Sequence, residues 1–429
     1  MEFHCGLDDR PPWWQRWLYG LQWFAVTVPI IVIIGRVTGG LHFPSPGDQI
    51  LYLQKMSFVM AAALLLQVLA GHRLPLITGP STVLLIGAVA SRGYPPQAVY
   101  TAILCGGLLL TLLSMTGLFG HLRKLFTPRV VAVVLMLIAF TLTPTILRLM
   151  TEAPGNGSAA SLAFGLTLVL VMFILHRFLR GVWKATLVVW AMAGGAWIAH
   201  LLFPAGEGFA ASVPLFAGFF RGISLKPVFD AGVLASFAFC YAALAVNDLG
   251  SIQSMNELLK PEGMDRRIRN GVILTGLTNA ASGILGVIGP VNYSLSLGVI
   301  ASTGCASRFT LPPTAVLLLL LSFSPALIAF IGDVPSVVIG AVLLYIVCTQ
   351  IAAGLVVAFE ARREVRMDDG LILGLPILLG TLIAFLPPEV LSAFPGGLRP
   401  VLGNGFAVGV TAALLMEHVI FAGNKRQAP

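Results

Sequence analysis

Charged side chains are scarce in this chain of 429 residues. Asp, Glu, Lys and Arg make up 10% of it, whereas soluble globular proteins carry roughly 25%. Hydrophobic residues make up 57%, and the mean hydropathy is +0.92. This balance excludes an ordinary soluble domain. Apolar runs of about 20 residues, the length that crosses a bilayer as a helix, recur along nearly the whole chain.

Cysteine and histidine are few, and neither clusters in the sequence. The five cysteines are Cys5, Cys105, Cys240, Cys305 and Cys348. The sequence contains no CxxC pair, no HExxH motif and no Cys/His spacing typical of a zinc site. We therefore expect packing cysteines, with no metal site, no cofactor and no disulfide framework.

The apolar runs predict an all-α polytopic membrane protein with fourteen transmembrane segments, seven in each half. The first half holds 17–38, 50–70, 74–91, 97–120, 127–150, 160–180 and 184–203. The second half holds 229–258, 268–288, 289–306, 310–331, 335–358, 370–387 and 398–422. The connection 204–228 is expected to lie on the outer membrane surface.

Basic residues exceed acidic ones by 8, but they lie in short loops between apolar runs. In such loops they indicate membrane orientation, so we expect no nucleic-acid partner. With fourteen segments, most of the basic loop residues fall on the side of both termini. The positive-inside rule then predicts a multi-pass protein of the cytoplasmic (inner) membrane with both termini in the cytoplasm.

Seven segments per half mean that the second half enters the membrane from the opposite side, so related halves form an inverted repeat. The third segment of each half is interrupted: LPLITGPSTVLLIGAVA begins at Leu74, and LGVIGPVNYSLSLGVIA begins at Leu285. Proline removes a backbone donor and favours extended backbone before it. Such backbone is tolerated at membrane depth only when it is buried in protein or lines a cavity. We expect two short extended breaks that pair, each followed by a half-helix whose N-terminus faces a ligand.

Segment ten resembles the signature of the nucleobase–cation symporter-2 family, the nucleobase–ascorbate transporters. That signature is Gln, Glu or Pro, then Asn, any residue, Gly, four residues, Thr, and Arg, Lys or Gly. The chain reads LSLGVIASTG here. Gly298, Thr303 and Gly304 match, whereas Leu295 and Ser296 do not.

The resemblance extends along the full chain. Segment eight reads VNDLGSIQS, and Asn247 takes the place of the family's key Glu. In segment three, GPST resembles Gly-Ser-Ser-Phe and places Ser81 on a substrate-site serine. LQWFA, from Leu21, resembles the Gln-His-Leu-Phe-Ala of the first segment, and the LLY that ends at Tyr345 also has a counterpart.

The resemblance implies a secondary transporter of a nucleobase, of the uracil or purine type, that works by alternating access. The residues expected to bind substrate are Trp23, Ser81, Thr82, Asn247, Ser251, Tyr293, Ser294, Leu295, Ser296 and Tyr345. Asn292 is expected to cap the half-helix instead. Asp248 is the hypothetical proton-coupling residue, because an ionisable group deep in a transmembrane segment usually marks function.

The family also implies a core domain, residues 1–125 and 206–332, and a gate domain, residues 126–205 and 333–429, in a homodimer. Two alternatives stay open. The loss of the family's carboxylates, with two half-helix N-termini kept, favours a small anion such as sulfate or bicarbonate as cargo. An uncoupled facilitator or binding protein is the other. Neither reading makes the chain an enzyme, and no ATP-binding motif is present.

Overall fold

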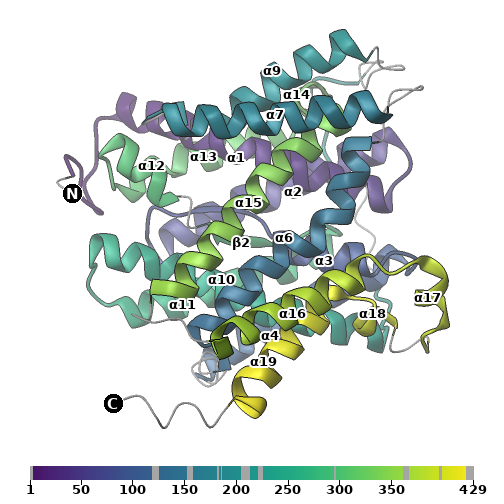
Figure 1. Cartoon of the computed structure of the whole chain (residues 1–429). Helices are drawn as coiled ribbons and strands as arrows, with labels where there is room; N and C mark the ends of the chain where they lie inside the picture. The colour runs from purple at the N-terminus through teal and green to yellow at the C-terminus, as the bar shows by residue number, and fades with distance from the viewer. Residues whose placement is uncertain are drawn as a thin grey trace.

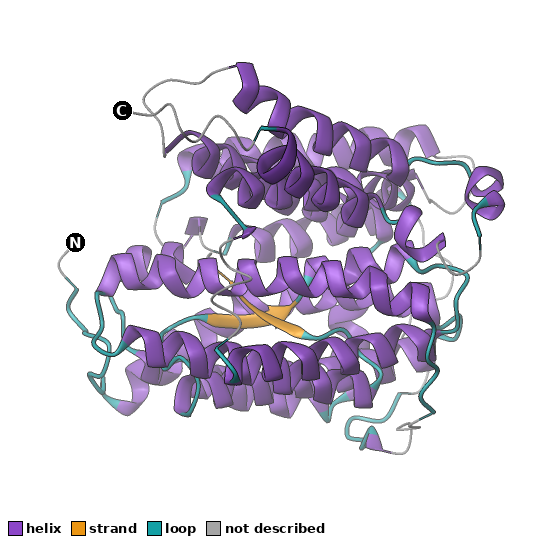
Figure 2. Ribbon diagram, turned by 90° about the horizontal axis from the view of Figure 1, so that it is seen from below, coloured by secondary structure: helices purple, strands orange, loops and turns teal. Residues whose placement is uncertain are grey.

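The computed structural model describes residues 3–117, 125–151, 158–180, 183–184, 186–203, 213–220, 226–293, 296–360, 367–395 and 399–421. Ser294, Leu295 and most of the connection 204–228 lie outside the described residues. Helices account for most of the described chain, and one pair of short strands crosses between them (Figure 2).

One group of helices surrounds the strands. It consists of α1 (Trp13–His42), α2 (Pro46–Leu69), α3 (Thr82–Ala90), α4 (Pro96–Met115), α10 (Ala231–Leu259), α11 (Met264–Leu285), α12 (Ser296–Thr303), α13 (Pro312–Ser322) and α14 (Pro325–Gly332). The strands are β1 (Ile77–Pro80) and β2 (Pro290–Tyr293), and a 3₁₀ turn, η2, spans Arg308–Thr310. Helix α11 packs along α4 and α2, while α13 packs along α2 and α1.

A second group packs mainly within itself. It consists of α6 (Pro128–Thr151), α7 (Ser158–Phe178), α9 (Leu187–Leu202), α15 (Ser336–Glu360), α16 (Met367–Ala384), α17 (Pro388–Ala393), α18 (Arg399–Leu402), α19 (Gly405–Leu415) and the π-helical turn η3 (Met416–Ile420). Helix α15 lies along α6 and α7, and α16 lies between α6 and α19 (Figure 1). The two groups meet where α10 contacts α18 and α19, and where α3 contacts α6.

Among the described residues, eight helices are long and apolar enough to cross a membrane: α1, α2, α4, α6, α7, α10, α15 and α16. Helix α11 has the length but is more polar, and α3 and α12 are short because each follows a strand. The chain is thus a multi-pass helical membrane protein.

The segment predicted over 310–331 is not one straight helix. Arg308–Ser322 and Pro325–Gly332 meet at 98°, which makes a broken span or a re-entrant loop. Ser324 explains the break, because its hydroxyl accepts from Leu327 N–H as the N-cap of a new helix. Pro325, at the first position of that helix, has no N–H with which to continue the preceding one.

Candidate functional site

The two Gly-Pro breaks form an antiparallel strand pair, which confirms the predicted pairing. Ile77 lies opposite Tyr293, and the register runs through to Pro80 opposite Pro290. Just past the strand end, Ser81 N–H donates to Gly289 O at 2.9 Å. Backbone N–H and C=O groups at the two breaks have no helical partners. They are bonded across the strand pair instead, inside the first group of helices.

Buried polar side chains gather behind β2. The Asp248 carboxylate, fully buried on α10, accepts from Asn292 N–H at 3.0 Å, from Asn292 Nδ2 at 2.8 Å and from Thr275 Oγ1 at 2.8 Å. Asn292 Oδ1 in turn accepts from Thr78 Oγ1 at 2.9 Å and lies 3.3 Å from His72 Nε2. These five residues, here called the Asp248 network, join α10, α11 and both strands. The three groups that donate to the carboxylate are all uncharged.

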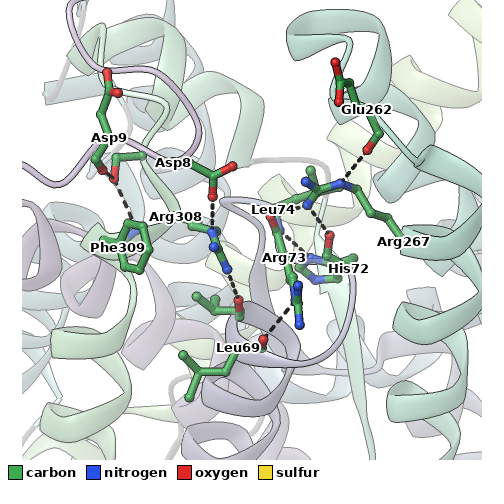
Figure 3. Close-up of polar contacts among 12 residues, drawn as sticks. Asp8, Asp9, Leu69, His72, Arg73, Leu74, Glu262, Arg267, Arg308 and Phe309 are labelled. Carbon is green, nitrogen blue, oxygen red and sulfur yellow. Dashed lines mark hydrogen bonds and ion pairs between the residues drawn. The ribbon is translucent and has the colours of Figure 1, made fainter.

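The His72 ring ends the network at the connection between α2 and β1. Leu74 N–H donates to His72 Nδ1 at 2.9 Å, so Nε2 carries the proton that faces Asn292. Burial lowers the pKa of His72 to about 4; the Asn292 bond opposes this effect, and the Arg267 charge adds to it. His72 is therefore neutral near pH 7. Arg267 Nη1 donates to His72 O at 3.1 Å (Figure 3).

The predicted hydroxyls at the two breaks make local bonds. Ser81 caps α3 by accepting from Leu84 N–H, and Thr82 after it is half-buried. Ser296 Oγ donates to Tyr293 O at 2.8 Å and accepts from Ile77 N–H at 2.9 Å. Each serine thus supports the start of a half-helix.

Tyr293 lies across the strand pair, and its hydroxyl donates to Pro80 O. A Cβ on Gly79 would come within 2.5 Å of the Tyr293 ring, so only glycine lets the ring lie this close. On α10, Ser251 Oγ donates to Asn292 O at 2.8 Å, which ties the helix to β2 a second time. Asn247 is half-buried beside Asp248.

Trp23 and Tyr345, two of the residues expected to bind substrate, lie on different elements and make contacts of their own. Trp23, buried on α1, donates from Nε1 to Thr310 Oγ1 at 3.0 Å. The Tyr345 hydroxyl, on α15 in the second helix group, lies 2.7 Å from His176 Nδ1 on α7.

The expectation that Asn292 caps the half-helix was wrong. Asn292 lies within β2, opposite Thr78, and its fully buried amide bonds to Asp248. His72, Thr275 and Thr78 were missed as well. His72 and Thr78 come from the first half of the chain, whereas Asp248, Thr275 and Asn292 come from the second, and a lone polar residue gives no sign of such a partner.

A cavity of about 430 Å³ lies between the ends of α1, α2, α4 and α11, and its described lining includes no residue of β1 or β2. Tyr52, Lys55 and Tyr100 are among its lining residues, and none of the predicted binding residues that the structure describes is. We place the candidate site at the strand pair, because both half-helix N-termini and the Asp248 network converge there.

Known proteins resemble the chain over nearly its whole length. The model of the Permease family, Xan_ur_permease, matches residues 14–389. The xanthine permease of Bacillus subtilis (strain 168) is 24% identical over 412 residues, covering 92% of this chain and 90% of its own. Xanthine permease XanP of Escherichia coli (strain K12) is 26% identical over 457 residues, covering 98% and 95%.

A solved structure shares the fold. The transmembrane domain of the cyanobacterium bicarbonate transporter BicA superposes with a TM-score of 0.61 at 15% identity, covering 88% of this chain and 97% of that one. The family match includes both strands, α10 and the whole Asp248 network. The predicted family is confirmed, and the chain belongs to the Xan_ur_permease family of permeases, the nucleobase–cation symporter-2 family.

Proposed function

We propose that the chain is a secondary transporter that carries a nucleobase, of the purine or uracil type, across the cytoplasmic membrane. The observation that carries the proposal is the family match over residues 14–389, in which relatives named xanthine permease align over nine tenths or more of both chains. A xanthine-type purine is the first substrate to test.

The proposed architecture is a fourteen-segment inverted repeat, with β1–α3 and β2–α12 as the third segment of each half. Residues 1–125 and 206–332 form the core domain, and 126–205 and 333–429 form the gate domain. The separate packing of the two helix groups supports this division. Movement of one group against the other exposes the strand pair alternately to each side. Both termini face the cytoplasm, and a homodimer follows from the family resemblance.

The substrate lies between the two half-helix starts. The proposed binding residues are Trp23, Ser81, Thr82, Asn247, Ser251, Tyr293, Ser294, Leu295, Ser296 and Tyr345. Asn247 presents an amide that both donates and accepts hydrogen bonds, which suits the polar edge of a base. Ser81 and Ser296 act through the half-helices that they support, because their hydroxyls already bond to the backbone.

Asp248 is the proposed proton-coupling residue. As a carboxylate it accepts two hydrogen bonds from Asn292, and these hold β2 against α10. Protonation removes the negative charge and turns one oxygen into a donor, which weakens those bonds. Proton binding at Asp248 would thereby loosen the strand that carries Tyr293, next to the substrate. This link from protonation to strand position gives a physical route to coupling.

The test is uptake into proteoliposomes that contain the purified full chain. Labelled xanthine, uric acid and uracil are compared with labelled sulfate and bicarbonate, with and without an inward proton gradient. We expect saturable uptake of at least one nucleobase that the gradient accelerates. Saturable anion flux without nucleobase uptake would refute the proposal and favour the anion alternative. Nucleobase flux that is the same with and without proton and sodium gradients would support the proposed substrate and refute the proposed coupling.

A further inference from the structure

The start of the chain is bonded to the turn that follows α12. Residues 3–9, here called the N-terminal strap, run parallel to residues 304–308. The backbone bonds are His4 N–H to Gly304 O at 3.1 Å, Ala306 N–H to Cys5 O at 2.9 Å and Arg308 N–H to Leu7 O at 3.1 Å. Side chains extend the contact. Arg308 Nε donates to Asp8 Oδ1 at 2.7 Å (Figure 3). Ser307 Oγ donates to Asp9 O at 2.6 Å.

This pairing brings three metal-ligand side chains together across about 300 residues of sequence. Cys5 and Cys305 are partners in the parallel bridge, so their side chains leave the same face. One donor atom each from His4, Cys5 and Cys305 lies within 4.8 Å of the others. Gly304 makes room for the imidazole, because a Cβ there would lie 2.8 Å from His4 Nδ1. Its φ of +67° is also one that residues with side chains rarely adopt.

The donor set fits a thiophilic metal ion. Two cysteines and one histidine are ligands that Zn²⁺ takes readily, with Zn–S near 2.3 Å and Zn–N near 2.0 Å. Tetrahedral geometry then needs donors about 3.5 to 3.8 Å apart. His4 is exposed and Cys5 is half-buried, so rotation of their side chains can bring the donor atoms to this separation. Tyr19 Oη lies 3.2 Å from His4 Nε2, which leaves Nδ1 for the metal and supplies the outer hydrogen bond that ligating histidines usually have.

We propose that His4, Cys5 and Cys305 form a metal-binding site of the Zn²⁺ class that clamps the N-terminal strap to the turn after α12. The three residues supply three ligands, and a water molecule takes the fourth position. The clamp holds the far end of α12, the half-helix that follows β2. Because the thiols bind as thiolates, metal binding releases protons, and its affinity rises with pH.

The test uses the purified full chain in detergent with a reducing agent that does not bind metal. Zn²⁺ is titrated against a chromogenic chelator, and Co²⁺ serves as the spectroscopic probe. We expect one Zn²⁺ per chain, a sulfur-to-cobalt charge-transfer band, and slower proteolysis of the strap when metal is bound. Bound Zn²⁺ also raises the unfolding temperature, since it stabilises the folded state.

Cys5→Ser, Cys305→Ser and His4→Ala should each weaken Zn²⁺ binding by more than about tenfold, since each removes one of three protein ligands. His4 is exposed, so His4→Ala tests the site without disturbing the buried core. Cys348→Ser, a half-buried cysteine on α15, is the matched control and should bind as the wild type does. Equal affinity in the wild type and Cys5→Ser, or the absence of a charge-transfer band, would overturn the proposal.

Discussion

Carboxylates are buried in both helix groups, but they are satisfied in different ways. In the first group, Asp248 accepts hydrogen bonds from Asn292 and Thr275, all from uncharged donors. In the second group, Arg129 on α6 pairs with Asp369 on α16 at 2.7 Å and with Glu417 on η3 at 3.0 Å. Hydrogen bonds from neutral groups offset the desolvation cost of burying Asp248. The positive charge of Arg129 offsets that cost for Asp369 and Glu417.

This difference separates a fixed cluster from one that can change. An arginine keeps its charge at any physiological pH, so the guanidinium that joins α6, α16 and η3 stays a cation. A carboxylate held by neutral donors can gain a proton without leaving an opposite charge buried and unpaired. The Arg129 cluster therefore suits a body that moves as a unit. The Asp248 network suits a site whose bonds change during transport.

The largest effect is expected at the charged cluster. Arg129→Ala removes the guanidinium that bridges Asp369 and Glu417, so it should lower the free energy of unfolding by about 3 to 5 kcal/mol. Thermal unfolding of the purified protein measures this. Arg266→Ala, at an exposed position on α11, is the control. A loss no larger than that of the control would show that the cluster is not held by charge.

The next effect is expected at the centre of the Asp248 network. Asn292→Ala leaves Thr78 Oγ1 and His72 Nε2 without their acceptor, so it should cost about 2 to 4 kcal/mol of stability. The measurement is the same unfolding assay, with Asn270→Ala on the neighbouring α11 as control. Unchanged stability would mean that other groups or water replace the amide, and the network would lose its structural role.

A pH effect of about 2 kcal/mol should follow from His72. Its pKa falls to about 4 on folding, from an ordinary value of 6.5, so the unfolded chain binds more protons between these values. Stability contributed by neutral His72 is complete above pH 6.5 and is lost as pH falls toward 4. Between pH 7 and pH 5 the wild type should lose about 2 kcal/mol more than His72→Gln, which cannot titrate. Parallel pH profiles would exclude His72 as the source.

The smallest effect on stability is expected for Asp248→Asn. The Asn oxygen can still accept both bonds from Asn292, now without charge assistance, while its amide donates to Thr275 Oγ1, so stability should change by less than about 1 kcal/mol. Proton-driven accumulation should be abolished, whereas substrate exchange should continue. Uptake with and without a proton gradient separates the two. Accumulation equal to that of the wild type would remove Asp248 from coupling.

The breaks in segments three and ten were predictable because proline and glycine restrict the backbone locally. GPST and GPVN indicated extended chain, and burial in a membrane left pairing as the way to satisfy it. The register of Thr78 opposite Asn292 was not predictable. Neither was the bend before Pro325, where a capping serine and a proline outweigh a continuous apolar run.

The candidate residues divide in the same way. Asp248 stood out because a charge inside an apolar run is costly wherever the helix packs. Glu417 is buried against Arg129, a residue 288 positions away, and nothing near either residue in the sequence indicates this pairing. The cysteines show no metal-binding motif in the sequence. Cys5 and Cys305 lie far apart along the chain and meet only through backbone pairing, so their spacing could not predict a shared site.

The sequence alone determined the environment of the chain, its helical class, the two Gly-Pro breaks and the family, since all of these depend on composition and local backbone restriction. Only the tertiary structure decided that Asn292 binds Asp248, that Arg129 joins α6 to α16 and η3, and that His4 meets two cysteines. The physical reason is that hydrogen bonds and metal sites depend on distances of a few ångströms, and such distances between remote segments are set by packing.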